Sequence, residues 1–163
     1  MKLSSLFLRA TTLLVLTVVL LTGCSNLFKL ENWKNLFVNT EALQSISILT
    51  DQDVNGGYPL ALDVVTITDS TVLNSLAGLR AAEWFSGKAD FQRQHQGKLT
   101  VFSWELVPGQ NFTNIKVASE PRNVVGIMVY ADYLGERSYR ASVQNQKKIV
   151  IRLQRDDFYV VSE

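Results

Sequence analysis

Residues that could carry out catalysis or hold a metal are sparse in this sequence. It contains one histidine, His95, and one cysteine, Cys24. His95 lies among polar residues at 92–96, and no second histidine exists to complete a metal site or an acid–base pair. A Gly-x-Ser-x-Gly elbow, a phosphate-binding loop and a dinucleotide fingerprint are all missing. The sequence therefore predicts a protein that is not an enzyme and that needs no metal or other cofactor.

One acidic stretch superficially resembles a calcium-binding loop. Asp51, Asp53 and Asn55 alternate with other residues before Gly56, as the first half of an EF-hand loop requires. The twelfth position of such a loop needs a glutamate, and Leu62 stands there. We therefore expect no calcium site in this stretch.

The cysteine stands at the end of an apolar segment. Residues 21–24 read Leu-Thr-Gly-Cys and end an apolar run over 13–21, which Lys2 and Arg9 precede. A basic segment, a short apolar segment and small residues before a cleavage point are the three parts of a secretory signal peptide. The apolar run is shorter than the about 20 residues that a membrane-spanning helix needs.

This arrangement resembles the signal of a bacterial lipoprotein, in which the cysteine receives a lipid and becomes the first mature residue. A plain secretory signal with a chance cysteine nearby is the alternative. The resemblance implies that residues 1–23 are removed and that Cys24 carries a covalent lipid. Ser25, and not aspartate, follows the cysteine. Within this class of proteins, that residue implies attachment to the outer membrane, with the domain facing the periplasm.

The rest of the chain suits one globular domain. The 163 residues carry 16 basic and 15 acidic side chains, so the net charge of +1 gives no reason to expect nucleic-acid binding. With a single cysteine no internal disulfide can form, and apolar burial must hold the core. We expect a signal peptide at 1–23, a lipidated tether at 24–42 and one folded domain at 43–163.

From residue 43 onward, alternating polar and apolar residues indicate strands. We expect strands at 43–50, 60–68, 99–106, 112–117, 124–131, 139–143, 149–153 and 158–161. The nearly unbroken apolar run at 124–131 is typical of a strand buried on both faces. Helical spacing predicts a helix from Thr71 to Phe85 that stops at residues 86–87, and residues 88–97 form either a second short helix or a loop. The pattern predicts an all-β protein, a two-sheet antiparallel β-sandwich with a short helical insertion after the second strand.

The loop between the first two predicted strands is the best candidate for a contact surface. Binding residues concentrate on loops that a rigid frame holds. This loop combines an aromatic residue, polar groups for a rim, and residue types that tolerate positive φ. Its candidate contact residues are Asp51, Gln52, Asp53, Val54, Asn55, Gly56, Gly57 and Tyr58. A plain hairpin connection without a binding role is the alternative.

Taken in order, these motifs resemble the TssJ family, the outer-membrane lipoproteins of the type VI secretion system. The resemblance runs from about residue 43 to residue 161. It rests on the lipoprotein signal and on the Asn/Asp/Gly loop before Pro59, the turn pair Pro108-Gly109, the strand at 124–130 and the pair Tyr139-Arg140, where the family often has Trp-Arg.

The resemblance implies a transthyretin-like β-sandwich that binds the periplasmic C-terminal domain of the inner-membrane protein TssM, and TssL indirectly. The loop at 51–58 would make this contact, and no small-molecule substrate is implied. Two other functions stay open: a pilotin-like lipoprotein that escorts a secretin, and a periplasmic ligand-binding or hydrolytic lipoprotein. The last would need Glu83, Asp90 and His95 to meet in a cleft.

Overall fold

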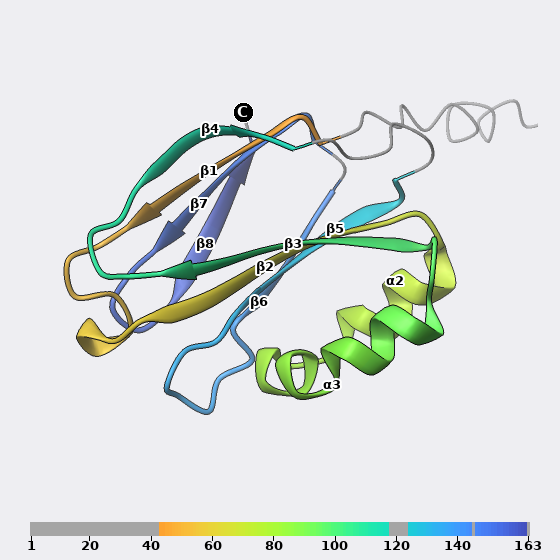
Figure 1. Ribbon diagram of the computed structural model, residues 1–163, viewed down its shortest axis with the longest axis horizontal. Coiled ribbons are helices and arrows are strands. Elements are labelled where there is room, and N and C mark those ends of the chain that lie inside the picture. The colour runs from red at the N-terminus through yellow and green to blue at the C-terminus, as the bar shows by residue number, and fades with distance from the viewer. Residues whose placement is uncertain (1–42, 118–123, 145, 163) are drawn as a thin grey trace, which may run out of the picture. The chain divides into compact units, whose positions relative to one another are not determined.

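The computed structural model describes residues 43–117, 124–144 and 146–162, and their strands form two four-stranded sheets (Figure 1). The first sheet has the order β4-β1-β7-β8, formed by Phe112–Lys116, Ser45–Thr50, Lys148–Leu153 and Phe158–Ser162. The second has the order β3-β2-β5-β6, formed by Leu99–Leu106, Leu60–Ile67, Gly126–Ala131 and Arg140–Val143. The expected two-sheet sandwich is confirmed.

One strand pairing departs from the purely antiparallel arrangement that we expected. β1 and β7 run parallel, from Ser45 opposite Lys148 to Thr50 opposite Leu153. The other pairings within the two sheets are antiparallel. Alternation along a strand indicates which side chains share a face, but it carries no information about the direction of the neighbouring strand.

Two helices connect β2 to β3, but their bounds differ from the helix at 71–85 and the second short helix or loop at 88–97 that we expected. α2 spans Ser70–Ala77 and α3 spans Ala81–Gln94. The predicted stop at residues 86–87 is wrong, because α3 continues through it and includes most of the stretch that the sequence left open. Gly87 has a packing role inside α3: a Cβ there would lie 2.8 Å from the ring of Phe91.

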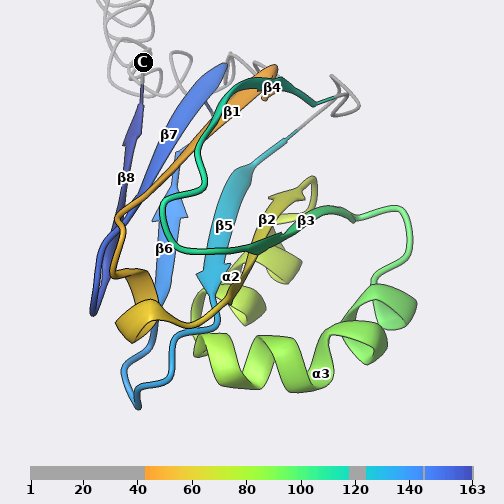
Figure 2. The same cartoon turned by 60° about the vertical axis from the view of Figure 1, so that its left-hand side comes forward.

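The helices lie on the outer face of the second sheet, on the side away from the first sheet (Figure 2). All of β5 is buried, and so is nearly all of β2. The apolar run at 124–131 therefore does contain a strand buried on both faces. Its outer face is covered by helices, which the sandwich pattern alone did not indicate.

Trp84 joins α3 to this sheet. Its fully buried ring stacks on Tyr130 and Phe91, with centroid distances of 5.0 Å and 5.9 Å. Its Nε1 donates a hydrogen bond of 2.8 Å to the carboxylate of Asp63 on β2, and Lys88 Nζ lies 2.8 Å from the same carboxylate. Asp63 is only 1% exposed, so the indole and the ammonium group supply the partners that a buried carboxylate requires.

The buried hydrophobic core of the described ranges lies between Leu43 and Phe158, so a chain that begins at Ser25 keeps all of it. Within the described ranges, no helix is long and apolar enough to cross a membrane. The predicted signal peptide at 1–23, the lipid site at Cys24 and the tether at 24–42 lie outside these ranges. These three assignments stay predictions.

Replacing Lys88 by methionine should lower the free energy of unfolding by about 2 to 3 kcal/mol, because it leaves the Asp63 carboxylate buried without its cation. This loss is at the low end of what breaking a buried ion pair costs, since 28% of the Lys88 side chain is exposed. Equilibrium urea unfolding measures the free energy of unfolding. Lys98→Met is the matched control: this lysine pairs with Asp69 in a more exposed bridge, so the loss should be clearly smaller than for Lys88→Met. Equal losses in the two variants would contradict the conclusion that Lys88 stabilises the buried carboxylate of Asp63.

Candidate functional site

The predicted contact loop connects β1 to β2 at one end of the sandwich (Figure 1). Its centre is a short 3-10 turn, Val54–Gly57. Asn55, Gly56 and Gly57 have positive φ angles of 52°, 66° and 89°. Glycine adopts such angles freely, and asparagine more readily than most residues. The Asn-Gly-Gly sequence therefore matches the backbone that this turn requires.

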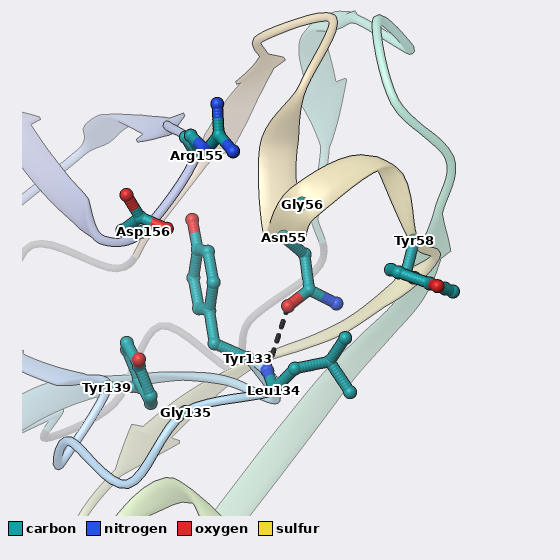
Figure 3. A pocket seen from close by; sticks show the side chains of 9 residues that line it. All are labelled: Asn55, Gly56, Tyr58, Tyr133, Leu134, Gly135, Tyr139, Arg155 and Asp156. Carbon is teal, nitrogen blue, oxygen red and sulfur yellow. Dashed lines mark hydrogen bonds between the residues drawn. The ribbon is translucent and has the colours of Figure 1, made fainter.

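Asn55 holds the loop in place. Its side chain Nδ2 donates a 3.0 Å hydrogen bond to the carbonyl oxygen of Pro59, and its Oδ1 accepts a 2.8 Å bond from the backbone N–H of Leu134 (Figure 3). Asn55 is only 4% exposed, and Val54 is fully buried. The expectation that Asn55 is an exposed rim group therefore needs correction: both of its amide atoms bond within the chain, and it fixes the loop to the β5–β6 connection.

Asp51, Gln52, Asp53 and Tyr58 present the exposed face of the loop. Tyr58 has 61% of its surface exposed. The carbonyl oxygen of Asp51 accepts a 3.0 Å hydrogen bond from the N–H of Gly109 in the β3–β4 turn. Gly109 has the positive φ, 74°, expected at the third position of a type II turn. Gln52 lies close against this glycine, where a Cβ would lie 2.5 Å from Gln52 Nε2.

Tyr133 connects the β5–β6 loop to the β7–β8 turn. Its hydroxyl oxygen lies 2.9 Å from the carbonyl oxygen of Gln154 and 2.8 Å from that of Asp157, so its one hydrogen is shared between them. Its ring stacks on Tyr139 at a centroid distance of 4.8 Å. Burial raises the pKa of the Tyr133 phenol, which stays neutral and keeps this hydrogen at physiological pH.

A cavity of about 210 Å³ lies where loop 51–58, the β5–β6 loop and the β7–β8 turn meet (Figure 3). These are called the three loops below. Its lining residues are Asn55, Gly56, Tyr58, Tyr133, Leu134, Gly135, Tyr139, Arg155 and Asp156. The lining contains no histidine, serine, threonine or cysteine, so it offers none of the usual catalytic nucleophile–base pairs. The volume lies below the about 300 to 1,000 Å³ typical of small-molecule pockets.

The sequence selected only the first of these three loops. Tyr133, Leu134, Tyr139 and Arg155 come from the other two, and no local pattern marks them as part of one surface. The pair Tyr139-Arg140, noted for its family resemblance, gave a partial signal: Tyr139 lines the cavity. Arg140 instead donates a 3.0 Å hydrogen bond to the carbonyl oxygen of Leu79, beyond the end of α2.

Glu83, Asp90 and His95, the residues that a hydrolytic site would need, do not line the same cavity. His95 lines a separate cavity of about 360 Å³, and neither Glu83 nor Asp90 lines it. The backbone N–H of Arg80 donates to Glu83 at 2.8 Å, which holds the pKa of this carboxyl below its ordinary value; a general acid needs the opposite shift. Asp90 pairs with Arg93 on α3. Among the described residues, no group of three or more His, Cys, Asp or Glu could hold a metal ion.

Solved structures of secretion lipoproteins share this fold. The T6SS lipoprotein TssJ1 from Pseudomonas aeruginosa matches with a TM-score of 0.58 and 16% identity, over 73% of this chain and 94% of that chain. Lip from Serratia marcescens, described as a membrane bound component of the Type VI Secretion System, matches with a TM-score of 0.58 and 17% identity, over 76% and 98%. The chain has the TssJ fold.

A third match is a chain in a structure described as the T6SS protein TssM C-terminal domain (869-1107) from EAEC. The TM-score is 0.54 at 10% identity, over 74% of this chain and 98% of that chain. No family model matches the sequence, and no curated protein is detectably similar to it. The likeness therefore lies in the three-dimensional fold, as expected from motifs that are short and widely spaced.

Replacing Asn55 by alanine should lower the free energy of unfolding by about 1 to 3 kcal/mol more than replacing Asn114, because it leaves the N–H of Leu134 without its acceptor. Asn114 is the matched control: it is exposed and has nearly the same positive φ, 54°. Both variants place alanine in a left-handed conformation, so their difference removes the backbone strain and leaves the hydrogen bonds and packing of the buried Asn55 side chain. Urea unfolding of the two variants, compared with the wild type, measures it. Equal destabilisation would show that the bonds of Asn55 do not hold the loop.

Proposed function

We propose that this protein is a TssJ-type lipoprotein of the type VI secretion membrane complex. In this proposal Cys24 carries the lipid, the sandwich faces the periplasm from the outer membrane, and the loop at 51–58 binds the periplasmic C-terminal domain of TssM. TssL joins the assembly indirectly, through TssM. The observation that carries the proposal is the TssJ fold. The lipoprotein signal in the sequence would supply the attachment to the membrane.

The loop is built in a way that favours recognition of a protein. Its backbone is fixed at several points, while Asp51, Gln52, Asp53 and Tyr58 stay exposed. A surface held rigidly before binding loses less conformational entropy on association than a flexible loop does. Exposed tyrosines beside polar residues are common at the centres of protein interfaces.

The third structural match supports TssM as the partner. The chain matched there is about half as long as the span 869–1107 named in its description. The matched chain is therefore too short to be the whole TssM domain. Its length and fold suit a TssJ-like protein present in the same structure as that domain. We therefore infer that the present chain contacts the corresponding domain of its own secretion system.

The function that follows is mechanical and involves no chemical turnover. A single acyl chain gives only marginal membrane binding, and stable anchoring takes more than one signal. A diacylglyceryl group with a further N-acyl chain, the modification expected for this lipoprotein class, meets that requirement. The lipid would then hold one end of the linkage in the outer membrane while the loop holds an inner-membrane partner.

Alanine at Asp51, Gln52 and Asp53 together should weaken binding to the periplasmic C-terminal domain of the TssM encoded in the same genome by at least about tenfold, or about 1.4 kcal/mol. Asn55 is left intact because its side chain holds the loop. Isothermal titration calorimetry with the purified chain from Ser25 measures the affinity. Alanine at Asp90, Gln92 and Glu105 is the control, since these exposed residues have a matched composition and lie on α3 and β3.

Two results would count against the proposal in different ways. Binding unchanged in the loop variant would remove the loop from the interface. Failure of the wild-type chain to bind the TssM domain, together with recovery of a secretin from solubilised envelope, would favour the pilotin-like alternative.

Replacing Cys24 by serine should abolish lipid attachment and leave the protein outside the outer-membrane fraction, because the thiol is the acceptor of the lipid. Labelling with radioactive palmitate and separation of membranes on a sucrose gradient measure both effects. Ser25→Thr is the control, since it keeps the cysteine and should keep the label. Continued labelling of the Cys24 variant would overturn the assignment of the lipid site.

A further inference from the structure

The cavity between the three loops is lined by tyrosines that come from two of these loops. Three tyrosines, Tyr58, Tyr133 and Tyr139, contribute to its lining. Tyr133 and Tyr139 are only 6% and 9% exposed and stack on each other, so they close the cavity from within. Tyr58 is 61% exposed and offers its ring to an incoming group. An accessible tyrosine ring favours another aromatic ring, through offset or edge-to-face contacts.

The charges around the cavity do not favour an anionic ligand. Arg155 lies 3.6 Å from Asp53, and Arg137 lies 3.2 Å from Asp157, so both arginines have carboxylate neighbours within the chain. Asp156 adds a further carboxylate to the lining. The extra carboxylate therefore disfavours an anionic occupant. A volume of about 210 Å³ gives room for a single side chain and is small for a cofactor.

Leu134 marks the approach to this cavity. Its side chain is 73% exposed although its backbone N–H is fixed by Asn55. Figure 3 shows Leu134 and Tyr58 together on one side, with Arg155 and Asp156 on the other. An exposed leucine beside an exposed tyrosine gives the edge of the cavity an apolar contact surface, and tyrosine is one of the residue types that most often anchor interfaces.

We propose that the cavity receives one aromatic side chain of the TssM periplasmic domain, with Leu134 and Tyr58 together packing against the segment that carries it. This inference rests on the proposed function and extends the interface from one loop to three. The surface would be continuous with loop 51–58, because Asn55 joins that loop directly to Leu134.

A unique cysteine tests whether the cavity is filled on binding. In the chain from Ser25, which has no cysteine of its own, Asp156→Cys places a thiol in the cavity lining. Addition of saturating TssM domain should slow its reaction with a maleimide at least about tenfold, because an occupant excludes the reagent. Ser162→Cys is the control: this exposed residue lies at the other end of β8, and its thiol should react equally fast with and without the domain.

Truncation of the flanking leucine gives a second measurement. Leu134→Ala should weaken binding of the TssM domain at least about tenfold, because it removes the apolar contact that flanks the filled cavity. Val161→Ala is the matched control, since Val161 is an exposed apolar residue, 44% exposed, near the far end of β8. Because Leu134 is exposed, its truncation should leave the urea midpoint unchanged.

The outcomes separate this inference from the function on which it rests. If the wild-type chain binds the TssM domain while Asp156→Cys reacts at an unchanged rate and Leu134→Ala binds normally, the cavity is empty in the complex and only this inference fails. If the wild-type chain does not bind the domain at all, both fail. Protection at position 156 together with weakened binding of Leu134→Ala would establish the three-loop interface.

Discussion

Asp63 places a carboxylate on the outer face of β2, in the middle of a sheet whose central strands are otherwise almost entirely apolar. It must be satisfied inside the protein, and Trp84 and Lys88 satisfy it from positions one turn apart on α3. The same helix face stacks on Tyr130, whose hydroxyl donates a 2.7 Å hydrogen bond to the carbonyl oxygen of Leu76 in α2. One buried acid thus determines where α3 lies, and Tyr130 ties α2 to the same place.

This helix cover has consequences for the loops at the end of the sandwich. β2 and β5 are buried on both faces, so the loops attached to them start from strands that cannot shift easily. Asn55 and Tyr133 then link the three loops to one another by hydrogen bonds and not by further strands. The result is a surface with exposed side chains on a fixed backbone. A partner that binds such a surface uses little of the binding energy to order it.

Strand positions could be predicted because alternation of apolar residues is a local property, and seven of the expected ranges contain a strand with nearly the expected ends. The eighth range, 124–131, contains β5. We expected this strand to be buried within the sandwich, but helices cover its outer face. The stop predicted at Gly87 failed because the glycine serves close packing with Phe91 and not termination. Asn55 was correctly expected to tolerate a positive φ, yet its burial depends on Leu134, 79 residues later in the chain. Contacts of that separation leave no local pattern, which is why two of the three loops were missed.

The parallel pairing of β1 with β7 has a consequence for how such a chain is made. β1 begins at Ser45, but β7 begins about a hundred residues later in the chain, at Lys148. The centre of the first sheet therefore cannot close until almost the whole chain is available, and contacts of such high sequence separation form slowly. In this topology the order of the strands itself delays folding, because the first sheet stays open at its centre until β7 is available to pair with β1.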